Sequence, residues 1–265
     1  MASIRAYVNG AGGSLGADLA VLKPVYTSGV YWYVGSSDAG ASDANAGTER
    51  GKPLLTLAQA YANASAGDTI DLLSGHAETI GTNIVVAKAG LSIVGEGIGS
   101  SAPRLTAGSA ITLEVTAAYV TLDNIYFPAS TFAAAVRVQT EAAGISMNAL
   151  IFECGANDTN ETINVSTGSS AIRLTNSRFT SVATGASVAI ECANNMAGLT
   201  LDNVTIDGGS FGWAAYAWRM DATITSIRAT NINILNGSNV IVGTGCTGTI
   251  QVGTATSDSE VNWTP

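Results

Sequence analysis

Two acidic residues at matching places in the chain could carry out the hydrolysis of a glycosidic bond. Glu153 follows the segment "ISMNALIF" and Asp207 follows "LTLDNVTI", and the two segments align residue by residue. Glycoside hydrolysis uses two carboxyl groups, roughly 5 to 10 Å apart, one of which is held protonated. If such segments stack as neighbouring strands about 4.8 Å apart, Glu153 and Asp207 lie two layers apart, on the order of 10 Å.

A third copy of the segment supplies the residues between these two carboxyl groups. It places Arg178 and Thr180 there, so a cation and a hydroxyl would separate Glu153 from Asp207. The alternative interpretation is that acidic residues at a turn after a strand are solvated corner residues. We favour this alternative, so no residue is predicted to be catalytic, and Glu153, Asp207 and Arg178 form the set that an enzyme would use.

Aromatic side chains are concentrated in two short runs of a chain that is only 6% aromatic. In "SFGWAAYAWRM" bulky residues alternate with small ones, so one strand face is bulky. This face could stack on sugars, or it could pack against a neighbouring subunit or a long loop. We favour packing because aromatic residues are enriched at interface cores. The second run, "VYWYVG", has the same two interpretations. The predicted interface or glycan contacts are Trp213, Tyr216, Trp218, Tyr31 and Trp32.

The cysteine and histidine residues do not suggest a metal site. Cys154, Cys192 and Cys246 are widely spaced, and His76 is the only histidine. We therefore predict no metal, no cofactor and no disulfide framework, and we interpret the cysteines as small buried hydrophobic residues. His76 follows a "SG" turn, where a solvated or hydrogen-bonded role is expected.

The segments quoted above are copies of a unit that recurs along the chain. Similar eight-residue units begin at positions 120, 145, 172, 199 and 227, which gives spacings of 25, 27, 27 and 28 residues. Their fifth position is asparagine in four units, Asn124, Asn176, Asn203 and Asn231. Because asparagine tolerates left-handed backbone, this column predicts a sharp corner, and stacked amides would form a structural ladder.

Short strands rich in β-branched residues fill the rest of each period, and turn residues separate them. A period of this length with several strands predicts an all-β parallel solenoid, whose coils pair with the coils above and below. The period and the asparagine corner resemble those of a single-stranded right-handed parallel β-helix, which is the fold we expect. Apolar residues at helical spacing predict a short N-terminal capping helix at about 54–64. We expect an N-terminal arm and first strand over 1–35 and the β-helix domain over 36–265.

The stretch from Ser36 to Glu78 resembles a widespread opening of β-helix proteins. The shared pattern is D-x-N-x-G-T, then K-P, T-L-x-x-A and A-x-x-G-D-T-I, and it covers about forty residues of this chain. The resemblance is to the pectin-lyase-like fold, found in secreted polysaccharide lyases and in phage tail and capsid-surface proteins. Asp43, Asn45, Gly47 and Thr48 lie in its first part and look like turn residues.

The chain departs from the lyases of that group. Those enzymes abstract a proton with a basic residue beside calcium held by clustered carboxylates. Here the only lysines, Lys23, Lys52 and Lys88, precede the regular coils, and no aspartate-rich cluster lies on a repeat strand. A lyase would have to use an arginine as its base, and arginine is hard to deprotonate.

Composition limits the class of partner. The net charge of −9 and the few scattered basic residues argue against nucleic acid. The N-terminal segment lacks the continuous apolar run of a signal peptide or a membrane helix, so we expect synthesis in a host cytoplasm. Together with the resemblance, an uncharged polar surface predicts a structural phage virion protein: a capsid decoration or cement protein or a short fibre, homotrimeric, docked on other virion proteins.

Two alternatives stay open. One is a tail-spike-like glycan depolymerase that uses Glu153 and Asp207. The other is a non-catalytic adhesin that binds a host surface glycan through Trp213, Tyr216 and Trp218.

Overall fold

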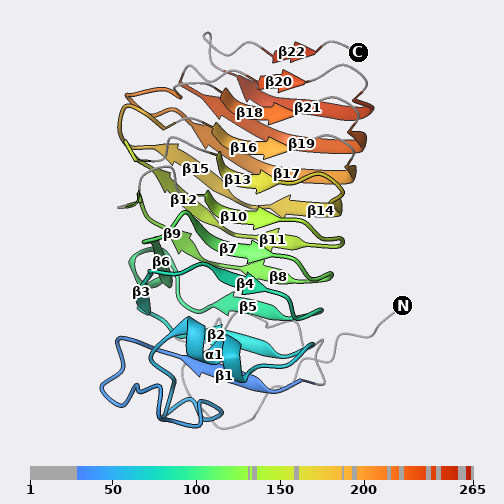
Figure 1. Ribbon diagram of the computed structural model, residues 1–265. Coiled ribbons are helices and arrows are strands. Elements are labelled where there is room, and N and C mark those ends of the chain that lie inside the picture. The colour runs from blue at the N-terminus through green and yellow to red at the C-terminus, as the bar shows by residue number, and fades with distance from the viewer. Residues whose placement is uncertain are drawn as a thin grey trace, which may run out of the picture.

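The computed structural model describes residues 29–130, 132, 136–157, 161–186, 188–192, 196–213, 216–220, 224–236, 240–242, 246–255 and 261–263, with backbone alone at 216–217, 240–242, 249–255 and 261–263. These residues form an all-β parallel β-helix with very little helix, which confirms the predicted fold class (Figure 1). Except at the ends of the sheets, each strand pairs in parallel with its equivalent one coil earlier and one coil later.

Two sheets run the length of the solenoid. Sheet B contains β4 (Ile84–Val86), β7 (Ile111–Val115), β10 (Val136–Thr140), β13 (Glu161–Val165), β16 (Val188–Cys192), β18 (Tyr216–Met220), β20 (Val240–Val242) and β22 (Val261–Trp263). Sheet A is folded along a corner into two strips, which we call strip A1 and strip A2.

Strip A1 contains β1 (Tyr31–Val34), β2 (Thr69–Leu72), β5 (Ser92–Gly95), β8 (Thr121–Asp123), β11 (Ser146–Asn148) and β14 (Ser170–Thr175). Strip A2 contains β3 (Ala77–Ile80), β6 (Arg104–Ala107), β9 (Tyr126–Phe127), β12 (Ile151–Cys154) and β15 (Arg178–Ser181). The long strands β17 (Ala197–Asp207) and β19 (Thr225–Leu235) run through both strips, and β21 (Gly248–Ala255) pairs with β19.

The corner between the strips is built from left-handed residues. The fifth position of every repeat unit, Ala149 included, has φ between 51° and 54°. The four asparagine amides at this corner all donate to the preceding coil, but their acceptors differ. Asn203 Nδ2 donates to Asn176 Oδ1 at 2.8 Å, whereas the other three amides reach backbone carbonyls or side chains beside the corner.

A second left-handed column was not predicted. The residue just before each repeat unit also has positive φ: Tyr119, Gly144, Ala171, Gly198 and Ser226. The first four residues of each unit therefore lie between two sharp bends, and the chain leaves sheet B through the first bend and crosses from strip A1 to strip A2 at the second.

The interior consists of stacked apolar columns. Phe127, Phe152 and Phe179 are fully buried on strip A2, with ring centroids 4.9 and 4.7 Å apart and nearly parallel planes. This spacing equals the strand separation, so each coil adds one ring to the stack.

The N-terminal end of the solenoid is covered by helix α1 (Leu57–Asn63), which lies beside β1 and β2 (Figure 1). Leu57 and Ala60 are buried in the core. The helix is shorter than the predicted 54–64, because Leu54 pairs with Val34 as a β-bridge and Thr56 is extended. The 3-10 turn η1 (Gly99–Ser101) completes the helical structure in the described residues.

The predicted arm falls on residues outside the described part of the chain, while the first strand is β1, paired in register with β2. No helix in the described ranges is long and apolar enough to cross a membrane.

Candidate functional site

Strip A2 places the two predicted carboxylates in one column. Glu153 on β12 pairs with Thr180 on β15, and Thr180 pairs with Asp207 on β17. Two strand separations put the backbones of Glu153 and Asp207 about 10 Å apart. Thr180 lies between them, and the side chain of Arg178 on the same strand extends over Thr180 to Asp207.

Asp207 accepts hydrogen bonds from three donors. Its Oδ2 accepts from Arg178 Nη2 at 3.3 Å, and its Oδ1 accepts from Asn236 Nδ2 at 2.6 Å and from the Gly209 backbone N–H at 2.8 Å. Arg178 also donates from Nε to Thr180 Oγ1 at 3.1 Å.

Glu153 is half-buried and has a different neighbour. Burial, together with the hydrogen bond and the negative charge of Glu153, raises the pKa of Tyr126 to about 12. The guanidinium of Arg104 lies over the Tyr126 ring, 5.0 Å from its centroid. Tyr126 is thus a protonated phenol at neutral pH, and its hydrogen bond can hold the Glu153 side chain in place.

Sheet B carries a second polar column that sequence reasoning missed. Glu114, Gln139, Asn164, Glu191 and Arg219 follow one another in register. All five are only partly exposed, and Arg219 Nη1 lies 3.5 Å from Glu191 Oε1. Aligning the sheet B strands on their penultimate residue would have found this column.

One further carboxyl group joins the sheet B column. Burial acts to raise the pKa of Glu161, but hydrogen bonds with Glu191 and Asn164 and the charge of Arg219 outweigh it, so the pKa is lowered. Glu161 and Glu191 are in direct hydrogen-bond contact, which is closer than the roughly 5 Å that a hydrolytic pair requires. This cluster is therefore suited to binding polar groups rather than to splitting a glycoside.

Two of the five predicted aromatic contacts, Trp213 and Trp218, are internal, which corrects the interpretation of "SFGWAAYAWRM". Trp218 is 1% exposed and Trp213 8%, and both belong to the core. Trp218 pairs with the inward residue Ile190, so the bulky face of β18 is the core face. Neither indole can stack on a surface glycan or on a second subunit. Tyr216 lies on β18, and only its backbone is described.

The other two aromatic residues belong to β1. Trp32 packs against the core, and its Nε1–H donates to Asp68 Oδ2 at 2.9 Å. The rings of Tyr31 and Tyr33 are stacked at 6.5 Å between centroids. Both Tyr31 and Trp32 are partly exposed, so part of this surface stays accessible.

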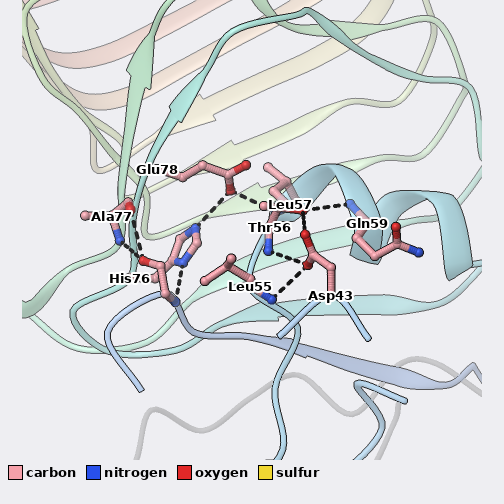
Figure 2. A network of polar contacts seen from close by, with 9 residues as sticks. Asp43, Leu55, Thr56, Leu57, Gln59, His76, Ala77 and Glu78 are labelled. Carbon is pink, nitrogen blue, oxygen red and sulfur yellow. Dashed lines mark hydrogen bonds and ion pairs between the residues drawn. The ribbon is translucent and has the colours of Figure 1, made fainter. Parts of the chain in front are cut away.

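His76 has a structural role, and Figure 2 shows its contacts. The ring is fully buried; Nδ1 accepts from the Ser36 backbone N–H at 3.0 Å, and Nε2 lies 3.2 Å from Glu78 Oε2. Glu78 in turn accepts from the Leu57 N–H at the start of α1. The network ties the first loop to the helix, so the hydrogen-bonded interpretation of His76 holds and the solvated one does not.

The described residues do not fit the calcium centre that the resemblance implies. No group of three or more His, Cys, Asp or Glu side chains in these ranges gathers closely enough to hold a metal ion. Cys154, Cys192 and Cys246 are all buried, as expected for apolar packing.

The fold defines the chain as a parallel β-helix protein, and comparison with known structures supports this class. A crystal structure of pectate lyase Pel9A superposes with a TM-score of 0.53 at 12% identity, covering 88% of this chain and 78% of the lyase. A rhamnogalacturonan lyase superposes with a TM-score of 0.57 at 14% identity, covering 86% of this chain and 64% of that protein. At these identities the likeness shows the fold alone.

No protein-family model matches the chain, and no curated protein sequence matches it.

Proposed function

We propose that the protein is a polysaccharide depolymerase that hydrolyses glycosidic bonds with Glu153 and Asp207. The observation that carries the proposal is the strand register, which places both carboxylates in one column with only Thr180 between them. The similarity of the fold to two polysaccharide lyases supports a carbohydrate substrate. The calcium-dependent elimination of those enzymes is not part of the proposal.

The environments of the two carboxyl groups assign their roles. Asp207, oriented by hydrogen bonds from Arg178, Asn236 and the Gly209 N–H, is the base that deprotonates a water molecule. The role left for Glu153 is protonation of the leaving oxygen, which requires its protonated form, and Tyr126 fixes its position. A separation of about 10 Å leaves space for water and sugar, which corresponds to hydrolysis with inversion of configuration.

The test is incubation of the purified chain with bacterial surface polysaccharides, polygalacturonate and rhamnogalacturonan. We expect new reducing ends, and NMR of the first products should show the inverted anomer. Glu153→Gln and Asp207→Asn should each lower the rate by roughly 10²-fold or more. Glu114→Gln, which removes one carboxylate from sheet B, is the matched control and should keep full activity.

Two results would contradict the proposal. One is the absence of new reducing ends across all the polysaccharides. The other is a product with a carbon–carbon double bond conjugated to a carboxylate, because that product requires elimination and not hydrolysis.

A second candidate is a glycan-binding protein that does not cleave. It is favoured by the complete hydrogen bonding of Asp207, which equally suits a rigid corner. Binding without new reducing ends would support it. Docking on a phage particle as a homotrimeric decoration protein or fibre is a further proposal that rests on the sequence, and its test is argued in the Discussion.

A further inference from the structure

The outer face of strip A1 carries two arginines in one column. Arg173 on β14 pairs with Thr200 on β17, and Thr200 pairs with Arg228 on β19. Ser146 and Thr121 continue the same column toward the N-terminal end. Both arginines are exposed, and two strand separations place their backbones about 10 Å apart.

The other arginines of the described ranges are already engaged. Arg50 pairs with Glu96, Arg178 with Asp207 and Arg219 with Glu191. The buried Arg137 donates to the Pro128 carbonyl oxygen, and Arg104 lies over Tyr126.

Arg173 and Arg228 differ from these residues, since neither forms an ion pair or a hydrogen bond within the described part of the chain. They are therefore available to a ligand.

Asp202 is the acidic side chain beside them, and it already has its own partners. Thr230 Oγ1 donates to Asp202 Oδ1 at 2.7 Å and Asn231 Nδ2 at 3.0 Å. These two hydrogen bonds lower the pKa of Asp202, and the charges of Arg228 and Arg173 add to the effect. Asp202 is the one carboxylate between the two guanidinium groups, and Asp123 lies two coils before Arg173, beside Thr121. Positive charge therefore exceeds negative charge at the end of strip A1 that holds the two arginines, in a chain of net charge −9.

We propose that strip A1 binds an acidic polysaccharide, with Arg173 and Arg228 each holding an anionic group of the polymer. A guanidinium presents a planar fork that pairs with a carboxylate or a sulfate through two hydrogen bonds. The span of two coils is close to the length of a disaccharide, so like groups on alternate sugars meet both arginines. Thr200, Ser146 and Thr121 supply hydroxyl groups for the sugars between and beside them.

An acidic polysaccharide suits this surface better than a nucleic acid does. Nucleic-acid binding draws its affinity from many neutralised phosphates, and two cations on an acidic chain cannot supply that. The site lies on the other side of the asparagine corner from Glu153 and Asp207, and it does not depend on cleavage there.

Binding is measured by titration calorimetry with four polymers: polygalacturonate, dextran sulfate, unmodified dextran and duplex DNA. To separate binding from turnover, the measurements are repeated in the Glu153→Gln background. We expect the chain to bind polygalacturonate, dextran sulfate or both, and to bind neither dextran nor DNA. The first two polymers distinguish carboxylate from sulfate recognition.

Variants locate the site. Arg173→Gln and Arg228→Gln should each weaken binding by about tenfold, as expected for the loss of one charged hydrogen-bonded contact. The double variant should abolish binding, and added salt should weaken the wild-type interaction because the site is exposed. Arg50→Gln removes the same charge from an exposed arginine at the N-terminal end and is the matched control.

The inference is wrong if the double variant binds the polyanion as tightly as the wild type does. It is equally wrong if Arg50→Gln weakens binding as much as Arg173→Gln, if DNA binds as well as the acidic polysaccharide, or if neither polyanion binds. A circular dichroism melt of each variant excludes misfolding, since both arginines are exposed and their replacement leaves the core unchanged.

Discussion

At the scale of single residues, backbone conformation at the two corners decides which side chains are favourable. An L-amino acid in the left-handed region costs roughly 1–2 kcal/mol, and only glycine and, in part, asparagine escape this cost. At the corner between strips A1 and A2, four of the five repeat units have asparagine and the fifth has Ala149. At the bend just before each repeat unit, Ala171 has φ 51°, whereas the preceding and following coils have Gly144 and Gly198 at this position.

Replacing Ala171 with glycine should therefore stabilise the protein. Relief of the left-handed cost exceeds the added entropy of the unfolded chain, so we expect Ala171→Gly to raise the free energy of unfolding by about 0.5–1 kcal/mol. Urea denaturation followed by circular dichroism measures the change. Ala197→Gly, an exposed strand alanine in β17, should lower stability by a similar amount. If Ala171→Gly lowers the free energy of unfolding as Ala197→Gly does, the backbone at Ala171 is not strained.

The contribution of Asp68 to the stability of the protein depends on pH. It is 4% exposed and accepts from the Val30 N–H, the Ser65 N–H and Trp32 Nε1–H at 2.7–2.9 Å. Burial acts to raise its pKa, but these hydrogen bonds and the charge of Lys88 outweigh it, so the pKa is lowered. A lowered pKa contributes stability above the unfolded value of about 4 and loses it as pH falls through the folded value.

We expect Asp68→Asn to lose about 1–3 kcal/mol at pH 7 and to show a flatter decline of stability below about pH 4. Denaturant titrations at several pH values, with Asp38→Asn as an exposed control, test this. If both variants keep the wild-type pH profile, Asp68 does not anchor β1.

Sequence patterns predicted some of these residue-scale features and missed others. The asparagine corner was predictable because asparagine is itself a signal for left-handed backbone, whereas Ala171 carries no such signal. The inward direction of Trp218 was not predictable, because alternation separates two faces of a strand without telling which is buried. The column of Glu153, Thr180 and Asp207 was predictable because β-helix register follows the repeat alignment directly.

At the scale of elements, the N-terminal motif explains how the first coil is closed. Asp43 Oδ1 accepts from the Leu55 and Thr56 N–H groups at 2.9 Å, and its Oδ2 accepts from Thr56 Oγ1 at 3.0 Å (Figure 2). Asn45 Nδ2 bridges the Gly40 and Pro53 carbonyl oxygens at 2.8 Å. The turn residues expected from the sequence therefore fasten the loop to the start of α1.

Loss of Asp43 should loosen the cap without unfolding the coils. Asp43→Ala removes the acceptor of two backbone donors, and we expect a loss of about 1–2 kcal/mol with faster hydrogen exchange in α1. Asp43→Asn keeps one oxygen acceptor and should retain most of the stability. Exchange measured by mass spectrometry separates α1 from the coils; unchanged protection of α1 in Asp43→Ala would contradict this role.

The boundaries of α1 were less predictable than its existence. Apolar spacing continues from Leu54 through Tyr61, so the pattern predicts an earlier start. Tertiary structure decides otherwise, because Leu54 N–H donates to the Tyr33 carbonyl oxygen at 2.8 Å and extends the edge of β1. The helix can begin only after Thr56, whose hydroxyl accepts from the Gln59 N–H.

At the scale of the whole molecule, the solenoid displays different charged residues on strip A1, strip A2 and sheet B. Strip A1 displays Arg173 and Arg228, strip A2 displays Glu153 and Asp207, and sheet B displays Glu191 with Arg219. Each surface is a column along the same axis, so a polymer that follows the axis meets equivalent positions in successive coils. The fold was readable from the repeat, but the pairing of charges across coils required the positions of side chains.

The last prediction concerns the N-terminal segment and attachment to a particle. The hydrogen bonds that hold β1 in place begin at Val30, so deletion of residues 1–27 removes none of the contacts described for the solenoid. We expect the truncated chain to keep the thermal midpoint of the full chain within about 2 °C, since all the core residues described for the solenoid are retained. If the segment docks on other virion proteins, the truncated chain should no longer sediment with phage particles, whereas the full chain should.

Light scattering of both chains reports whether a homotrimer forms and whether the segment is needed for it. A truncated chain that still decorates particles would place the docking surface on the solenoid. A large fall in the midpoint would show instead that the segment contributes to folding, because the loss of attachment would then follow from unfolding.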